Sequence, residues 1–141
     1  MAQPSRWDAI VDGSLPIPAN DNLGFRIEGT DDPAERVTFS WTVPSEYTNS
    51  AGGLQGGMLA AFADALLGGA SAAYLPPERY PALAEMKISI FRPVPAGMTL
   101  KGAGYVVKSG RRVIFAEAEI SDEDGNLIAK ASGTEIPADM P

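Results

Sequence analysis

One long apolar segment limits the folds open to this chain. Residues 49–74 read NSAGGLQGGMLAAFADALLGGASAAY, a polar, glycine-rich loop that runs into an apolar stretch whose only charge is Asp64. Apolar residues recur there at helical spacing, which predicts a helix that begins near residues 55–57 and buries one face. The predicted core face comprises Leu59, Phe62, Ala63, Leu66 and Ala70.

Asp64 is the residue of this helix that most needs an explanation. A carboxylate is rarely left among alanines, glycines and leucines unless it is paired, hydrogen-bonded or used in chemistry. Our hypothesis is that Asp64 is used; the alternative is a buried acid that caps a loop or an interface. Gly68 and Gly69 lower helix propensity by ~1 kcal/mol each relative to Ala, which suggests that tight packing selects them. The face around Asp64 also carries Ala60, Ala61, Gly68 and Ser71.

Alternating side chains predict strands on both sides of the helix. Before it, 35–43 places Val37, Phe39 and Trp41 on one face and hydroxyl residues on the other, and a short strand is expected at 23–29. Consecutive strands joined by short turns are antiparallel. The expected fold is α+β, with an antiparallel sheet of five or six strands on one long helix. The four strands predicted after the helix are 83–92, 98–108, 113–121 and 127–136.

The rest of the chain fits a single domain over residues 1–141. A short helix is expected at 4–12 and a connecting loop at 14–22, so that 1–22 precede a core at 23–136. The N-terminus lacks the pattern of a signal peptide. The apolar run is slightly short of the ~20 residues that span a bilayer. We therefore expect no membrane segment and a cytoplasmic protein.

Two absent residue types exclude whole classes of chemistry. The chain has neither Cys nor His, so Ser-His-Asp and Cys-His catalysis, His-ligated zinc and a His general base are excluded. Carboxylates, Lys and Tyr remain for acid–base work. The net charge of -7 argues against nucleic acid or an anionic membrane as a partner.

Several motifs together resemble a known family. Their order is Asn49, then Gln55-Gly56-Gly57, Asp64, the F-R-P turn at 91–93, Gly110-Arg111, and Asp124-Gly125 before Gly133-Thr134. This order and spacing are similar to those of the hotdog-fold acyl-CoA thioesterases of the phenylacetate-degradation type. The resemblance covers 23–136. It implies a sheet wrapped around a central helix, a homodimer with active sites across its interface, and usually a dimer of dimers, a homotetramer.

The resemblance also implies a role for each matching residue. Asp64 corresponds to the catalytic acid midway along the helix, as general base or as nucleophile. Gly57, with Gly56 beside it, corresponds to the helix N-terminus whose N–H polarises the thioester carbonyl. Asn49 is implied to orient water or to hold its loop. The alternative role for the glycines is to allow a tight loop-to-helix turn.

Two residues depart from the family pattern. Gln55 replaces the usual His of the H-G-G motif, and Leu83 stands where the next strand usually begins with Ser or Thr. The Gln amide can still donate a hydrogen bond but cannot transfer a proton. Leu83 removes a hydroxyl that helps to place the attacking water.

Substrate contacts are expected in two places. The segment 86–116 has no Asp or Glu. We expect the cations near the strand ends of this segment to contact the phosphates of coenzyme A. The alternative for Arg111 is a structural role in a turn. Phe62, Leu83 and Met86 are candidates for the acyl pocket, although at these spacings they also fit a core. No metal or other cofactor is expected, because CoA is part of the substrate. The four expected cations are Arg92, Lys108, Arg111 and Arg112.

The leading hypothesis is thus an acyl-CoA thioesterase. Hotdog hydratases and dehydratases rely on a His, which this chain lacks. One alternative, suggested by Gln55 and Leu83, is a catalytically weak protein that binds acyl-CoA or another acyl ligand. A second is a thioesterase for acyl-carrier-protein, whose acidic surface would meet the basic segment.

Overall fold

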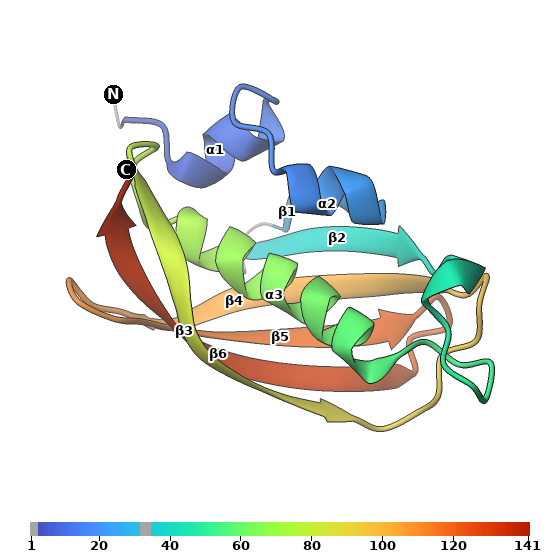
Figure 1. The fold of residues 1–141 in the computed structure, drawn as a ribbon. Helices are drawn as coiled ribbons and strands as arrows, with labels where there is room; N and C mark the ends of the chain where they lie inside the picture. The colour runs from blue at the N-terminus through green and yellow to red at the C-terminus, as the bar shows by residue number, and fades with distance from the viewer. Residues whose placement is uncertain (1–2, 32–34) are drawn as a thin grey trace.

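A computed structural model describes residues 3–31 and 35–141. Within these residues six strands form one antiparallel sheet in the order β1-β2-β4-β5-β6-β3 (Figure 1). The predicted α+β architecture is confirmed. The strands are β1 (Arg26–Asp31), β2 (Arg36–Thr42), β3 (Arg79–Ile90), β4 (Thr99–Ser109), β5 (Ile114–Asp122) and β6 (Leu127–Asp139). The helices are α1 (Arg6–Val11), α2 (Pro18–Leu23), the 3-10 turn η1 (Ser45–Tyr47) and α3 (Gly56–Ala72).

Helix α3 lies on one face of the sheet, and its predicted core face is confirmed. All five residues of that face are at most 2% exposed. Phe62 packs between Phe25 and Trp41, with ring centroids 5.1 and 5.6 Å away, and such pairs stabilise a core by about 0.5–1.5 kcal/mol beyond area burial. A Cβ at Gly104 of β4 would overlap the α3 backbone at Leu66. Glycine at this position therefore lets the helix rest directly on the sheet.

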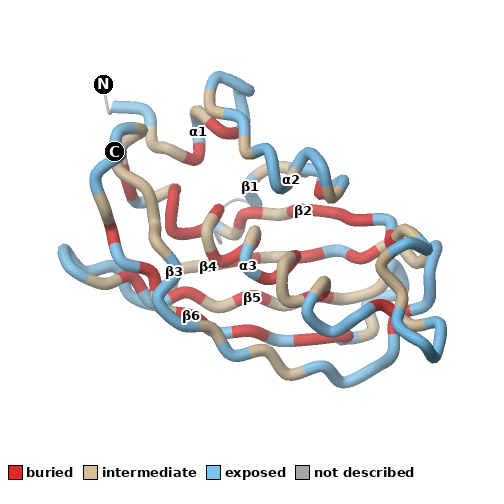
Figure 2. The backbone as a smooth tube through the Cα atoms, in the orientation of Figure 1, coloured by how far each residue is buried: buried red, intermediate tan, exposed pale blue. Residues whose placement is uncertain are grey.

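Strand alternation also matches the sequence. Inward residues of β2 and β5, such as Val37 and Ile114, are completely buried, and Figure 2 shows buried segments along β2 and in alternation along β5 and β6. The bounds of three strands differ from the prediction by more than one residue: β1 lies at Arg26–Asp31 rather than at 23–29. β3 begins at Arg79 rather than at 83, and β6 continues to Asp139. Pro81 and Pro137 are tolerated because they face each other where β3 and β6 pair only with one another.

The N-terminal region contains one more helix than expected. The predicted first helix is present as α1, with Ser5 and Asp8 forming a reciprocal capping box. The predicted loop at 14–22 was wrong in part, because α2 occupies Pro18–Leu23. Pro18 fits the first helical turn, and Gly24 ends α2 with a φ of 85°.

The two glycines of α3 have different surroundings. A Cβ at Gly69 would lie 3.0 Å from the Trp7 ring and 3.3 Å from Phe39, so close packing accounts for this glycine. At Gly68 a Cβ would meet nothing within 4 Å, so the prediction of tight packing was wrong there.

Residues 3–24 cover one side of α3; Met1 and Ala2 lie outside the described residues. The Trp7 indole donates a hydrogen bond to Thr30 Oγ1 at 2.7 Å, and the Arg6 guanidinium donates to the Pro77 carbonyl at 2.7 Å. Figure 1 shows α1 and α2 above α3. No helix among residues 3–31 and 35–141 is long and apolar enough to cross a bilayer.

Candidate active site

The N-terminus of α3 presents free backbone donors to solvent. Gln55 is the N-cap, makes no side-chain cap hydrogen bond, and its N–H donates to the Tyr47 carbonyl at 2.9 Å. Among the described residues no acceptor is found for the N–H groups of Gly56 and Gly57. Both glycines are exposed, and a Cβ at Gly57 would meet nothing within 4 Å. Unpaired N–H groups at the positive end of a helix suit an oxyanion.

Asn49 organises the loop that leads into α3. Its Oδ1 accepts hydrogen bonds from the N–H of Ala51 at 2.9 Å and of Gly53 at 3.2 Å. Its own N–H donates to the Gly53 carbonyl at 2.7 Å. The loop is also tied to the segment after β3, because Leu54 N–H donates to the Val94 carbonyl at 2.7 Å. The side-chain oxygen of Asn49 is therefore engaged within the loop in the single chain.

Asp64 lies at the middle of α3 without a charged or hydrogen-bonded partner among the described residues. Solvent reaches its side chain in the single chain. The surrounding apolar groups nevertheless displace enough water to raise its pKa above the ordinary value of an aspartate. A desolvated, unpaired carboxylate is a stronger base than one in open solvent.

Asp64 also lines a cavity of about 310 Å³ between α3 and the N-terminal helices. Small residues of α3, including Ala65 and Gly68, form its floor. Arg6 of α1 and Tyr80 of β3 are the other groups in its wall that carry a charge or a titratable hydroxyl. Its largest apolar wall residues are Trp7, Ile10, Ile17, Leu23, Phe25 and Phe39.

The sequence analysis missed one acid, Glu135 of β6. Its side chain is 1% exposed, and neither carboxyl oxygen has a hydrogen-bond partner in the described structure. Burial, and secondarily the charge of Asp64, raise its pKa to about 8. A signal was available in the sequence: in alternation, Glu135 falls on the same strand face as Ala129, Ala131 and Gly133.

The candidate acyl-pocket residues separate in the structure. Phe62 is completely buried in the aromatic core and is not among the residues that line the Asp64 cavity. Leu83 and Met86 lie on β3, opposite Glu135 and Gly133 of β6 respectively. Leu83 remains 40% exposed.

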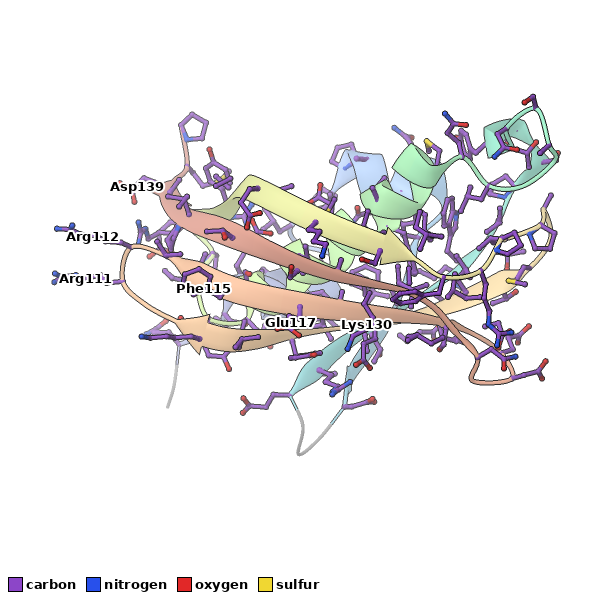
Figure 3. The ribbon with its side chains drawn as sticks, turned by 90° about the horizontal axis from the view of Figure 1, so that it is seen from below. Arg111, Arg112, Phe115, Glu117, Lys130 and Asp139 are labelled. Atoms are coloured by element: carbon purple, nitrogen blue, oxygen red, sulfur yellow. The ribbon has the colours of Figure 1, made fainter. Side chains whose placement is uncertain are left out.

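The four expected cations form two groups. Lys108, Arg111 and Arg112 line a hollow of about 370 Å³ at the β4–β5 turn, with Phe115 beside them. In Figure 3 Arg111 and Arg112 extend outward from this turn. Arg92 is not among the lining residues, because it follows the end of β3 and not the β4–β5 turn. The structure thus brings three of the four cations together.

Gly57 and Asp64 lie on the same side of α3 but not at the same height. Seven residues amount to almost two helical turns, or about 10 Å along the axis. One small carbonyl group therefore cannot contact the Gly57 N–H and the Asp64 carboxylate of the same chain at once.

Comparisons with known proteins agree with this architecture. The family model of the Thioesterase superfamily matches residues 51–129. A phenylacetic acid degradation-related protein of Ralstonia eutropha JMP134 is 29% identical, with a TM-score of 0.84, over 93% of this chain and 98% of that chain. The phenylacetic acid degradation protein PaaI of Thermus thermophilus, solved as a mutant, is 25% identical, with a TM-score of 0.75, over 85% of this chain and 98% of that chain.

A third solved structure shares the fold. It is a protein of Streptococcus mutans UA159 bound to acetyl CoA, 19% identical, with a TM-score of 0.72, over 82% of this chain and 89% of that chain. A comparison with curated protein sequences gave no match.

Proposed function

This chain belongs to the Thioesterase superfamily, as a hotdog-fold protein of the PaaI-like type, and from that premise we propose that it hydrolyses an acyl-CoA thioester to a free acid and CoA. The observation that carries the proposal is Asp64, a partly desolvated carboxylate that has no partner among the described residues and lines a cavity. It lies on a helix whose first N–H groups are free.

The N–H of Gly57, with that of Gly56 beside it, would polarise the thioester carbonyl. Negative charge develops on that oxygen in the transition state, and fixed donors at a helix N-terminus stabilise it. Gln55 is exposed at the N-cap, and its side-chain amide is free to donate to the same oxygen.

Asp64 would promote the attack on the carbonyl carbon. As a general base it takes a proton from water while the water oxygen bonds to the carbon; the C–S bond then breaks and CoA leaves as a thiolate, which takes up a proton. In the alternative route the carboxylate attacks directly, and water hydrolyses the resulting anhydride. Both routes give the same products, and neither requires a metal or an added cofactor.

The separation of about 10 Å between Gly57 and Asp64 along α3 supports a site shared by two chains. We propose that Gly57 of one protomer and Asp64 of its partner act on one thioester. A homodimer then has two such sites, and a dimer of dimers has four. This arrangement gives a reason for the exposure of both groups in the single chain.

The acyl group would occupy the cavity beside Asp64. A dry cavity of ~150 Å³ already holds benzene, so a cavity of about 310 Å³ has room for an aromatic or medium-length aliphatic acyl group. The CoA phosphates would meet Lys108, Arg111 and Arg112 at the β4–β5 turn. The acetyl CoA held by the Streptococcus mutans protein of this fold is consistent with CoA as the thiol part of the substrate.

Release of free thiol from acetyl-, hexanoyl- and phenylacetyl-CoA tests the proposal. Asp64→Asn keeps the size of the side chain and removes the base, so turnover should fall at least ~100-fold. Glu123→Gln, at an exposed turn residue, is the matched control and should leave turnover unchanged. Unchanged turnover in Asp64→Asn would contradict the assignment.

The same assay separates the alternatives. Saturable binding of acyl-CoA without thiol release would favour the catalytically weak binding protein that Gln55 and Leu83 suggest. Faster release from the same acyl group on a carrier protein would favour the acyl-carrier-protein thioesterase.

A further inference from the structure

Gly68 of α3 is an interior helix residue that packing does not explain. Glycine is less favourable than alanine inside a helix, because its backbone loses more freedom on folding. At the neighbouring Gly69 a Cβ would lie 3.0 Å from the Trp7 ring, so a larger residue would be crowded there. At Gly68 a Cβ would meet nothing within 4 Å. The stability of the single chain therefore favours alanine at position 68, and the glycine needs another explanation.

Gly68 lines the same cavity as Asp64. This cavity of about 310 Å³ lies between α3 and the N-terminal helices. Residues four apart in a helix share a face, and they are separated by about 6 Å along the axis. Because the space around Gly68 is open, a side chain at this position would project into the cavity, about one helical turn from the Asp64 carboxylate.

Burial along α3 gives the cavity a direction. Asp64 is exposed, and Ala65 and Gly68 are half-buried. Further along the helix, Gly69 and Ala72 are buried, and they line the cavity as well. The cavity thus leads from solvent at Asp64 toward the interior at the C-terminal end of α3. An acyl chain whose carbonyl lies beside Asp64 would extend in this direction, across Gly68.

The wall next to Gly68 is apolar and firmly held. Trp7 of α1 is 4% exposed, and its ring is the one that a Cβ at Gly69 would meet. Its indole donates a hydrogen bond to Thr30 Oγ1 of β1 at 2.7 Å, and its ring centroid lies 5.7 Å from that of Phe39 on β2. A wall that is fixed to two strands does not withdraw easily. The size of residue 68 therefore decides how much of the cavity stays open.

We propose that Gly68 is a specificity-determining residue, whose missing side chain leaves room for the apolar tail of a medium-length acyl group. The inference rests on the proposed thioesterase function and goes beyond it, because it names the position that limits the size of the acyl group. A dry cavity of ~150 Å³ holds benzene, which has six carbons, so a six-carbon tail fits the space beside Gly68. No bond forms or breaks at Gly68.

A graded set of substitutions at position 68 tests the proposal. Gly68→Leu adds an isobutyl group to the cavity, and the ratio of kcat/KM for hexanoyl-CoA to that for acetyl-CoA should fall at least ~10-fold. Gly68→Ala should lower this ratio less than Gly68→Leu does, and its Tm should stay the same or rise. Gly68→Val is a second bulky variant and decides the question where Gly68→Leu does not fold. An unchanged ratio in the bulky variant would overturn the proposal.

The rival explanation for Gly68 is the close approach of a second chain. Size-exclusion chromatography with light scattering gives the mass of the assembly for wild type and for each variant. Under the proposal Gly68→Ala and wild type have the same mass, because the added methyl enters a cavity within one chain. A smaller assembly in Gly68→Ala would overturn the proposal and assign this glycine to a subunit contact.

A binding measurement that needs neither turnover nor CoA separates this inference from the thioesterase assignment. Hexanamide is a neutral six-carbon probe. Of the two tryptophans of the chain, Trp7 lines the cavity and Trp41 does not. In ¹H–¹⁵N NMR of the full-length protein, hexanamide should shift the Trp7 indole signal saturably and more than that of Trp41. The Kd should rise at least ~10-fold in Gly68→Leu.

The titration has two outcomes that contradict the site. They are a Trp7 signal that does not move in wild type, and an equal Kd for wild type and Gly68→Leu. If wild type binds hexanamide at Trp7 but releases no thiol from any acyl-CoA, the thioesterase proposal fails. The role of Gly68 in keeping the cavity open to an acyl-sized ligand then stands on the titration alone.

Discussion

Leu83 of β3 and Glu135 of β6 are register partners, so an aliphatic side chain stands opposite the buried acid. The family resemblance leads one to expect a hydroxyl at position 83. Here the polar group on this pair of strands is carried by β6 instead. The departure at Leu83 and the buried Glu135 are therefore two parts of one local arrangement.

Leu83→Ser should give Glu135 a hydrogen-bond partner. A hydroxyl that donates to a carboxylate favours the ionised form and lowers the pKa. The pKa of Glu135, followed by carboxyl ¹³C NMR, should then move from about 8 toward lower values. Leu83→Ala, which is equally short but lacks the hydroxyl, is the control for lost packing. An identical pKa of Glu135 in the Ser and Ala variants would contradict the prediction.

Glu135 should also make the stability of the protein depend on pH. Its carboxyl keeps its proton up to about pH 8 in the folded chain, whereas an unfolded glutamate loses it near a pKa of about 4.3. Between these values the folded state binds more protons, so the free energy of unfolding falls as the pH rises, by about 1.4 kcal/mol per pH unit from this group.

Urea unfolding at about pH 5.5, 6.5 and 7.5 measures this slope, because all three pH values lie between the pKa of Glu135 in the unfolded and in the folded chain. In Glu135→Gln the free energy of unfolding should change less with pH than in wild type over that range, because the amide does not titrate. Equal slopes for the two proteins would show that Glu135 ionises normally in the folded chain.

The periodic elements of the fold were predictable because burial imposes a period on the sequence. The strand face of Val37, Phe39 and Trp41 and the core face of α3 both appear as apolar repeats. The helix α2 was not predictable in this way. It has six residues and none is buried, so it has no apolar face to detect, and Pro16 and Pro18 favour a loop.

The candidate site was predictable only in part. Asp64 and Gly57 stand out as a lone charge and a glycine pair in one continuous segment. Glu135 lies far along the chain from them, on the last strand, where it is buried opposite Leu83 of β3. Phe62 is a different case: its type and spacing are more often those of a core residue than of a ligand pocket, and in the structure it packs against Phe25 and Trp41.

Gly57→Ala should change stability and activity in opposite directions. A Cβ at this position meets nothing within 4 Å in the chain, and Ala favours a helix over Gly by up to about 1 kcal/mol. Tm should therefore stay the same or rise. The added methyl would crowd the thioester against the N–H of residue 57, so kcat/KM should fall at least ~10-fold. Full activity in a stable Gly57→Ala protein would place the carbonyl elsewhere.

Charge reversal at the β4–β5 turn should weaken CoA binding without affecting the fold. Lys108, Arg111 and Arg112 are exposed around one hollow, and cations placed there would attract phosphates through solvent-screened interactions of up to about 1 kcal/mol each. The double variant Lys108→Glu, Arg112→Glu should raise KM for acyl-CoA about 10-fold or more and leave kcat nearly unchanged. The difference from wild type should shrink as the salt concentration rises.

A matched control distinguishes a local effect from a change of net charge. Arg26→Glu reverses the charge of an exposed cation on β1. Strand β1 is an edge strand of the sheet and does not pair with β4 or β5, so this cation lies away from the β4–β5 turn. Its KM should equal that of wild type. A short thioester that lacks the nucleotide should give the same KM with the double variant and with wild type, because it has no phosphates to bind. If the double variant raised KM equally for both substrates, the turn would act on the acyl site and not on the nucleotide.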